Sequence, residues 1–560
     1  MGIEELKKCF NQITIFTGEY DRRIEGMNIF RLKYKEVPFL VAFDDFFPNS
    51  KPFIFAPRVN SLDEFIPHIL SANQVCYLDN EGIILDEQNP VGIIREAVLK
   101  AYDTVINSVT GNSKEDFLLE FDYYWNNVQE PNSIFVSLIP DLNRIELVWL
   151  GMVGENYVVA QTKDEVKEYL ARASLDSSSV RFQKVLHIPL TKSGGVSFSK
   201  KWNISYLRKL IYSNIGFRAG IDNILKEDFT IPIYVTLPLM DESRVHFGIQ
   251  FERPSNKIHP LLDEANVRNF EAIVIDRMDV DYLLPRGGAN RSLYLKKVCI
   301  IGCGAVGGIV ANELAKAGIG NLFLIDDDRL TKDNLYRHHL GNSSGLGTFK
   351  VEGLKKRIES DLPLSNVETC NKKIEIIIRD NLVNFDEYDL IVDATGVPNS
   401  SFYSLKYFYE NFPAKPLIHV WLEPLGIGGH AIASNNNKMK GCYKCIYSQV
   451  EEYGIYNKAS FAAPGQNFSK SMFGCAGRFT PFSSRDATRT AILAVDLAEA
   501  ILLGIEKDNP LLSWKGDSTR FLENEFKLSD RYTKMSMERL FENRYEYKKE
   551  KCLICSKKEI

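Results

Sequence analysis

The stretch that decides the fold is Lys297-Val-Cys-Ile-Ile301, which runs directly into Gly302-Cys-Gly304-Ala-Val-Gly307. A helical stretch, 308–317, comes next, and a second apolar run, 321–325, ends at Asp326. Glycines at these spacings allow a tight turn and a close approach of the backbone to a ligand, while the helix N-terminus favours an anion. This strand, turn and helix together predict a nucleotide site.

A glycine pattern of this kind, taken alone, most often binds NAD, with an acidic residue such as Asp326 on a ribose hydroxyl, and it can also be a purely structural turn. The alternation of apolar strand, helix and acidic strand end returns at 389–393, after another helical stretch. This repeat predicts a parallel, doubly wound sheet in the C-terminal half of the chain.

The residues after Asp326 do not suit a dehydrogenase. Asn334-Leu-Tyr-Arg337 comes a short loop later, and Lys350 follows in Gly347-Thr-Phe-Lys350. An amide and two cations near the strand ends fit a triphosphate and its departing pyrophosphate better than hydride transfer. The alternative for each cation, taken singly, is a solvated surface charge.

This pattern resembles that of the ubiquitin-activating, or ThiF-type, adenylation enzymes, over roughly residues 285–560. The resemblance implies an ATP site in which Asp326 binds the ribose, while the amide and the two cations bind the phosphates. The two cations also act in catalysis. It also implies a doubly wound, Rossmann-like domain that pairs into a homodimer. The residues that match the signature in type and order are Gly302, Gly304, Gly307, Asp326, Asn334, Arg337 and Lys350.

One position departs from the ThiF-type pattern. The family usually places an Mg2+-linked Asp shortly after a strand that ends in Asp-x-Thr, whereas this chain reads Asp393-Ala-Thr-Gly396, with glycine at that place. Asp393 is therefore the expected nucleotide and Mg2+ residue, unless the phosphates hold the metal. The other interpretation of Asp393 is a cap of the strand end.

Four of the ten cysteines form two Cys-x-x-Cys pairs, Cys442/Cys445 and Cys552/Cys555. Four thiolates have the number and type of ligands for a tetrahedral structural Zn2+. A closed four-sulfur site leaves no position for a substrate, so we expect it to attach the C-terminal tail to its domain. Buried thiols without a metal are the alternative, and the same pairs occur in ThiF-type enzymes.

Cys475 stands alone in a segment with glycines and a proline, just before a helix expected to open near 483–486. A thiol close to Arg478 and to a helix N-terminus can have a lowered pKa and be nucleophilic. A buried structural cysteine is the default alternative. The segment resembles the catalytic-cysteine crossover loop of activating enzymes, which implies that Cys475 accepts the acyl group.

The first region contains a second candidate thiol, Cys76. Its order of elements resembles the ubiquitin-conjugating fold: a proline-bounded strand at 47–55, Pro67-His68, the single Cys76, Asn89-Pro90 and then a helix. The His-Pro-Asn motif of that family is scrambled here. The resemblance implies that Cys76 is an acyl acceptor, and tethering to an activating domain raises the effective concentration of one thiol near the other. Without that resemblance, Cys76 would be an ordinary cysteine in a strand or turn.

The chain has 560 residues, of which 45% are hydrophobic and 25% charged, and 68 Lys and Arg against 73 Asp and Glu give a net charge of -5. This composition is that of a globular multidomain protein without a basic field for nucleic acid or an anionic membrane. The start lacks a signal peptide, and the apolar stretch 491–505 contains two acidic residues, so we expect a cytoplasmic protein without a membrane span.

We predict a multidomain α/β protein in three parts: a ubiquitin-conjugating-like α+β domain (1–115), a central α+β linker domain (116–284) and a doubly wound ThiF-type domain (285–560). This order resembles the bacterial fusion enzymes of CBASS antiphage operons, which act on the C-terminus of a cyclic-oligonucleotide synthase, the CD-NTase. The resemblance implies that ATP and Mg2+ convert a partner's C-terminal carboxylate to an acyl-adenylate. The acyl group then passes to Cys475, to Cys76 and finally to an amine of unknown identity.

Three other functions remain open from the sequence. A sulfur-carrier adenylyltransferase of cofactor biosynthesis would use the same ATP site without needing Cys76. A NAD-linked oxidoreductase would need a nicotinamide pocket, for which the sequence has no dedicated residues. A nucleotide-regulated scaffold would bind a nucleotide and require neither thiol.

Overall fold

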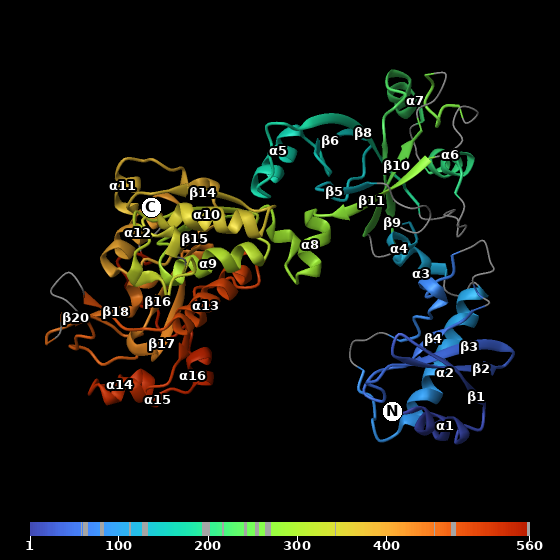
Figure 1. The fold of residues 1–560 in the computed structure, drawn as a ribbon. Helices are drawn as coiled ribbons and strands as arrows, with labels where there is room; N and C mark the ends of the chain where they lie inside the picture. Colours follow the sequence, from blue (N-terminus) through green and yellow to red (C-terminus); the bar gives the residue numbers. More distant parts are fainter. Residues whose placement is uncertain are drawn as a thin grey trace. The chain divides into compact units, whose positions relative to one another are not determined.

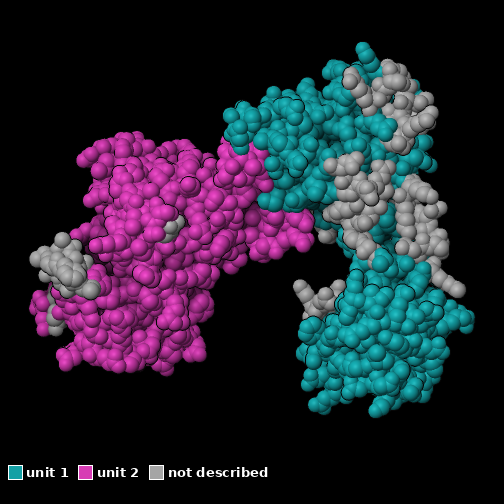
Figure 2. Space-filling view, viewed as in Figure 1, with its two compact units in different colours: residues 1–167, 176–278 teal, residues 168–175, 279–560 magenta. Residues whose placement is uncertain are grey.

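The computed structural model describes residues 1–57, 59, 65–78, 83–110, 114–125, 133–192, 202–214, 218–239, 243–252, 257–263, 270–341, 343–452, 454–471 and 478–556. The chain forms two compact units (Figure 2). Unit 1 comprises residues 1–167 and 176–278, and unit 2 comprises residues 168–175 and 279–560. Among the described residues, no helix combines the length and the apolar character that crossing a membrane requires.

The N-terminal part of unit 1 is an antiparallel sheet with two helices. Its elements are α1 (Ile3–Asn11), β1 (Gly18–Ile24), β2 (Met27–Tyr34), β3 (Val37–Phe43), β4 (Phe53–Phe55) and α2 (Pro90–Val109), with the strands in the order β1-β2-β3-β4. The side chain of Asn89 caps α2 by accepting from Gly92 N at 2.9 Å, and a proline occupies its first turn. Buried residues recur along α2 at helical spacing, so one face packs into the core of this part. The predicted α+β character is confirmed.

The remainder of unit 1 contains a closed barrel, which the sequence analysis did not predict. The strands follow the order β10-β11-β5-β7-β6-β8-β9, with parallel and antiparallel neighbours. Its elements, with the short helices that precede and accompany them, are α3 (Lys114–Leu119), α4 (Phe121–Trp125), β5 (Ser133–Ser137), β6 (Glu146–Val153), β7 (Asn156–Ala160), α5 (Lys163–Arg172), β8 (Arg181–Pro189), α6 (Ile204–Ser213), α7 (Arg218–Glu227), β9 (Ile233–Pro238), β10 (Arg244–Phe251) and β11 (Phe270–Arg277).

Unit 2 is built on a seven-stranded sheet in the order β14-β13-β12-β15-β16-β17-β22 (Figure 1). The first five strands are parallel, and β17 and β22 are antiparallel to their neighbours. The strands are β12 (Lys297–Ile301), β13 (Asn321–Ile325), β14 (Asn366–Cys370), β15 (Leu390–Asp393), β16 (Leu417–Leu422), β17 (Gly428–Ser434) and β22 (Leu511–Lys515).

Helices cover both faces of this sheet, which confirms the predicted doubly wound fold. One core contains buried residues of α9, α10 and α13, and the other contains buried residues of α11 and α12 together with three of the paired cysteines. The helices of unit 2 are α8 (Val280–Arg286), α9 (Ala305–Lys316), α10 (Lys350–Asp361), α11 (Ile374–Arg379), α12 (Pro398–Asn411), α13 (Ser484–Leu502), α14 (Thr519–Glu523), α15 (Asp530–Lys534) and α16 (Met537–Glu542).

Unit 2 also contains two short pairs of antiparallel strands: β18 (Tyr447–Val450) with β19 (Gly454–Asn457), and β20 (Lys470–Ser471) with β21 (Arg478–Phe479). The predicted domain boundary 115/116 falls within α3, and the boundary 284/285 falls within α8. These boundaries stay predictions.

Candidate functional site

The glycine-rich turn between β12 and α9 is compact because two of its glycines leave no room for a side chain. Gly302 has a φ of +86°, and a Cβ there would lie 2.7 Å from the backbone nitrogen of Thr395. A Cβ on Gly307 would lie 1.8 Å from the carbonyl oxygen of Gly302. Gly304 differs, because a Cβ there would meet nothing within 4 Å. The turn is therefore closed toward the sheet and open at Gly304.

A cavity of about 390 Å³ opens beside this turn, at the carboxyl ends of β12, β13 and β15. In a doubly wound sheet this is the edge where ligands bind, and the volume suits a small molecule. Of the predicted site residues, Gly302, Gly304, Asp326 and Lys350 line the cavity. Gly307, Asn334, Arg337 and Asp393 are not among its lining residues.

Asp326 is held by the backbone around it. One carboxylate oxygen accepts from Cys303 N at 2.6 Å, and the other accepts from Asp328 N at 2.8 Å. Burial raises the pKa of Asp326, while the charge of Lys350 and the two N–H donors act in the opposite direction. The carboxylate is thus fixed at the end of β13, facing the cavity.

Lys350, the first residue of α10, is a buried cation at the cavity, with an exposed fraction of 7%. Its Nζ lies 2.6 Å from Oδ2 of Asp328, whose own side chain is largely exposed. Its backbone N–H also donates to Asp328 O at 3.0 Å. An anion that enters the cavity therefore competes with Asp328 for this ammonium group.

The turn that contains Asn334 and Arg337 is fastened to the glycine-rich turn by His338, which the sequence analysis missed. His338 Nε2 lies 2.8 Å from the carbonyl oxygen of Cys303, and Leu340 N donates to His338 Nδ1 at 3.1 Å. These two bonds assign the neutral ring with the proton on Nε2. Burial lowers the pKa of His338 to about 4, so the ring stays neutral near pH 7.

The side chains of Asn334 and Arg337 are engaged differently. Asn334 Oδ1 accepts from the backbone nitrogen and the hydroxyl of Thr331, at 3.0 and 3.1 Å. The guanidinium carbon of Arg337 lies 4.9 Å from the ring centre of Phe482. Asn334 thus shapes its own turn, while Arg337 is in contact with the chain just before α13.

Asp393 uses its carboxylate within the chain. Oδ1 accepts from the backbone nitrogen and hydroxyl of Thr395, at 3.1 and 2.7 Å, and Oδ2 accepts from the Ser404 hydroxyl at 3.2 Å. These bonds match the interpretation of Asp393 as a cap of the strand end, and Thr395 rather than Asp393 lines the cavity. Its role toward nucleotide or Mg2+ stays a prediction.

Two further cations, Lys372 and Lys373, line the cavity and were not expected. They follow β14, and their side chains are exposed. Their place after a parallel strand is the signal that could have identified them, because all such strand ends meet at one edge of the sheet. The cavity therefore contains three lysines near the turn.

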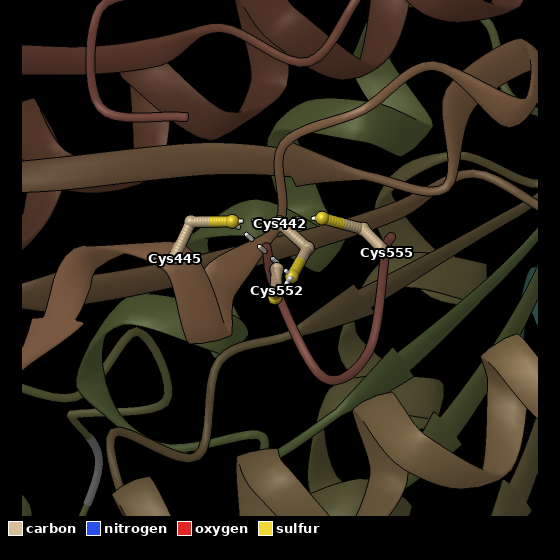
Figure 3. Close-up of side chains that lie close together, drawn as sticks. All are labelled: Cys442, Cys445, Cys552 and Cys555. Atoms are coloured by element: carbon tan, nitrogen blue, oxygen red, sulfur yellow. Dashed lines mark hydrogen bonds between the residues drawn. The ribbon is translucent and has the colours of Figure 1, made fainter. Parts of the chain in front are cut away.

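The four paired cysteines lie together (Figure 3). The Sγ atom of Cys442 lies 3.9 Å from that of Cys445 and 3.7 Å from that of Cys552. The Sγ atoms of Cys445 and Cys555 are 3.5 Å apart. Four sulfurs at about 2.3 Å from a central Zn2+ would be roughly 3.8 Å from one another. A disulfide would need sulfurs about 2.05 Å apart. The geometry fits a tetrahedral metal site.

Cys76 is half-buried and follows a short bridge to β4. Its backbone N–H donates to the carbonyl oxygen of His68 at 2.8 Å. The His68 ring lies between two carboxylates: Nδ1 is 2.8 Å from Glu120 and Nε2 is 3.1 Å from Asp116. The hydrogen bond to Glu120 is the main cause that raises the pKa of His68 to about 9, although burial opposes it. The loop beside Cys76 is thus bonded to α3 and the residue that follows it.

Cys475 lies outside the described residues, in the stretch 472–477. On either side of that stretch, Ser471 and Arg478 are paired across β20 and β21. The helix expected after it is present as α13, which begins at Ser484. The roles of Cys475 and of the other site residues stay predictions.

Two family models match the chain: residues 285–485 match the ThiF family, and residues 5–134 match the Prokaryotic E2 family B. We therefore call residues 5–134 the E2 domain and residues 285–485 the ThiF domain, after the families that these parts of the chain resemble. The antiparallel sheet around Cys76 lies in the E2 domain, and the glycine-rich turn with its cavity lies in the ThiF domain.

Curated relatives match most of the chain. The ATP-dependent ubiquitin transferase-like protein Cap2 of Pseudomonas aeruginosa is 24% identical over 476 residues, which cover 80% of this chain and 82% of that protein. Cap2 of Vibrio cholerae is 25% identical and covers 80% and 81%. The adenylyltransferase and sulfurtransferase UBA4 of Lodderomyces elongisporus is 26% identical over only 34% of this chain and 42% of that protein.

Among solved structures, Escherichia coli MccB with ATP is 22% identical and covers 43% of this chain and 67% of that chain, with a TM-score of 0.31. The two family models and the Cap2 relatives place the protein among enzymes that adenylate a substrate for ubiquitin-like conjugation. It is an adenylyltransferase whose residues 5–134 resemble the Prokaryotic E2 family B.

The two glycines of the ThiF turn allow a matched test. Gly304→Ala should keep the thermal unfolding midpoint but weaken ATP binding about tenfold or more, because the added methyl group enters open space beside the cavity. Gly307→Ala should instead lower the midpoint, because its methyl group collides with a backbone carbonyl. Calorimetric titration with ATP and thermal unfolding would check both. Unchanged ATP binding by Gly304→Ala would contradict the placement of the nucleotide.

The hydrogen bond between His68 and Glu120 predicts that the stability of the E2 domain depends on pH. Because the pKa of His68 is raised above the ordinary 6.5 to about 9, its stabilising contribution is present below pH 6.5 and is lost as the pH rises through 9. Glu120→Gln should return the pKa toward 6.5, and Asp116→Asn should lower it less, because its contribution is smaller. Nuclear magnetic resonance titration of labelled histidines would measure this. A ring that titrates near 6.5 in the unmodified protein would refute it.

Proposed function

We propose that the protein uses ATP and Mg2+ to activate the C-terminal carboxylate of a partner protein, and that it ligates this terminus to an amine through two thioesters. The observation that carries the proposal is the presence of a ThiF domain and an E2 domain in one chain. We further propose residues 1–115 as the conjugating domain, 116–284 as a connecting domain and 285–560 as the activating domain.

Two rival functions explain less of the molecule. A sulfur-carrier adenylyltransferase needs no E2 domain, and the UBA4 relative matches about a third of the chain, whereas the Cap2 relatives match 80%. A NAD-linked oxidoreductase has no use for Lys350, Lys372 and Lys373 around one cavity, because hydride transfer develops little anionic charge.

In the first step, an oxygen of the partner's carboxylate attacks the α-phosphorus of ATP, and the bond from that phosphorus to the bridging oxygen breaks. The products are an acyl-adenylate and pyrophosphate. In the proposal, Asp326 accepts a hydrogen bond from the ribose, while Asn334, Arg337 and Lys350 bind the phosphates. Mg2+ would offset phosphate charge there, with Asp393 as the candidate ligand. Open space at Gly304 supports this placement, because it lets phosphate approach the backbone.

In the next steps, the thiolate of Cys475 attacks the acyl carbon and releases AMP. The thiolate of Cys76 then takes the acyl group and frees Cys475. An amine finally attacks the second thioester, forms the amide, loses a proton and releases Cys76. Division of one difficult ligation into several transfers is covalent catalysis, and each transfer needs the thiolate form.

The four cysteines have a separate role in the proposal. Zn2+ bound by Cys442, Cys445, Cys552 and Cys555 would attach the C-terminal tail to the ThiF domain and would contribute to folding rather than to catalysis. The sulfur–sulfur distances of 3.5, 3.7 and 3.9 Å and the burial of Cys442, Cys445 and Cys552 support this role.

We propose a CD-NTase as the partner whose C-terminus is activated, and antiphage defence as the process, on the resemblance to CBASS fusion enzymes. The Cap2 relatives match 80% of this chain. The amine acceptor is not identified. In the proposal, the protein acts in the cytoplasm as a homodimer that forms through the ThiF domain, without nucleic acid or a membrane.

The order of the two thiols can be tested because adenylation precedes both transfers. With a candidate CD-NTase partner, ATP and Mg2+, Cys475→Ala should keep ATP–pyrophosphate exchange but form no thioester. Cys76→Ala should accumulate an adduct on Cys475 and deliver nothing to an amine. Gels run with and without a thiol reductant separate thioesters from the final amide.

Either of two results would reject the relay. If Cys76→Ala conjugates the partner as well as the unmodified protein does, the E2 domain only binds. If Cys475→Ala does so, the acyl group passes directly from the adenylate to Cys76.

The metal role is tested separately. Cys442→Ser should lose one Zn2+ per chain and lower the thermal unfolding midpoint, because metal binding contributes folding free energy. Cys370→Ser is the matched control, since Cys370 is a half-buried cysteine outside the cluster and its loss should leave the metal in place. Elemental analysis measures the metal. An unmodified protein without stoichiometric Zn2+ would remove the assignment.

A further inference from the structure

Arg337 is a cation that an aromatic ring, rather than a carboxylate, holds in place. Its guanidinium carbon lies 4.9 Å from the centre of the Phe482 ring, within the range of a cation–π contact. Among the described residues, no carboxylate forms an ion pair with Arg337. Lys350 differs, because Asp328 already pairs with it at 2.6 Å. Arg337 therefore keeps its full charge available for an anion.

The backbone on which Arg337 lies is fixed by local bonds. Arg337 N and His338 N both donate to the carbonyl oxygen of Asn334, at 3.0 and 2.8 Å. The ring of His338 is bonded to Cys303 O at 2.8 Å, which ties this turn to the glycine-rich turn. What remains to be set is the direction of the long Arg337 side chain, which loses rotamer entropy when it is ordered.

Phe482 is itself held by the scaffold on both sides. The preceding residue, Pro481, accepts a hydrogen bond from Leu425 N at 2.7 Å. The following residue, Ser483, caps α13 and exchanges hydrogen bonds with Asp486, at 2.7 and 3.3 Å. The Phe482 ring packs against the core that contains α9 and α13. The ring is thus a fixed surface for the guanidinium group.

We infer that Phe482 is a positioning residue for Arg337, which keeps the guanidinium group directed for phosphate before ATP binds. The inference rests on the proposed function, in which Arg337 binds the phosphates. A ring face attracts the cation without neutralising its charge and without occupying its N–H donors. A carboxylate would neutralise the charge and would also accept hydrogen bonds from those donors. Phe482 also lies seven residues after Cys475, so the chain that carries the candidate nucleophile carries this ring as well.

The test measures the affinity for ATP with Mg2+ by calorimetric titration, with no partner protein required. Phe482→Leu keeps an apolar side chain but removes the ring, and it should weaken binding about tenfold. Phe482→Tyr keeps the ring and should bind within about twofold of the unmodified protein. Phe482→Leu should lower the thermal unfolding midpoint slightly, because the half-buried ring also packs against the core, and the Arg337→Ala background separates positioning from packing.

A matched control removes a comparable pair elsewhere. The guanidinium carbon of Arg544 lies 4.1 Å from the ring centre of Phe541. Phe541 is an exposed residue of α16 and does not line the cavity. Phe541→Leu should leave ATP affinity unchanged. A second control combines the variants: Phe482→Leu should have no further effect in an Arg337→Ala background, because the ring acts through that side chain.

The outcomes separate this inference from the proposed function. If the unmodified protein binds no ATP, or Arg337→Ala binds it normally, the proposed phosphate site fails. If Arg337→Ala weakens binding but Phe482→Leu does not, only the positioning role is overturned. It is also overturned if Phe482→Leu weakens binding equally with and without Arg337, since the ring would then act by packing alone.

Discussion

The close approach of Gly307 to the carbonyl oxygen of Gly302 is the constraint on which the ThiF domain depends. A Cβ at Gly307 would lie 1.8 Å from that oxygen, so α9 can begin directly against the end of β12 only with glycine there. The turn that results places Cys303 between two other segments. The N–H of Cys303 donates a hydrogen bond to Asp326 at the end of β13. Its carbonyl oxygen accepts a hydrogen bond from His338, in the turn that contains Arg337. One tight turn thereby sets the distances among the residues predicted to bind the nucleotide.

Charges of both signs surround the cavity, and they are arranged unequally. Asp326 is fixed by backbone donors, and its pKa is raised because burial disfavours its charge. Lys350 is neutralised by an exposed carboxylate that can swing into water, so an entering anion can replace it at modest cost. Arg337 lies on a ring and is not neutralised by a carboxylate of the described residues. In the proposed site, a polyanion would take Lys350 from Asp328, and Arg337 would be a second cation that no described carboxylate already neutralises.

The parts of this protein that the sequence predicts are those set by local chemistry. The turn at Gly302, the strand end at Asp326 and the Cys-x-x-Cys pairs each depend on neighbours a few residues away, and the structure contains all of them. The closed barrel was not predicted, because strand order and closure depend on pairings distant in sequence. His338 was missed for a related reason: a histidine beside an arginine resembles a surface residue until the fold buries it against Cys303. The bonds of Asp393 to Thr395 and Ser404 likewise became visible only once β15 and α12 were in place.

The cysteine cluster constrains more than the C-terminal tail, because of what lies between its two pairs. Cys442 and Cys552 are 110 residues apart, and the chain between them contains Cys475, Phe482, α13 and β22. A bound metal that joins both ends restricts the unfolded forms of this whole segment, and for a long loop the entropy removed grows only slowly with length. The gain in folding free energy therefore depends little on the exact length of the segment, because it comes from joining the two ends.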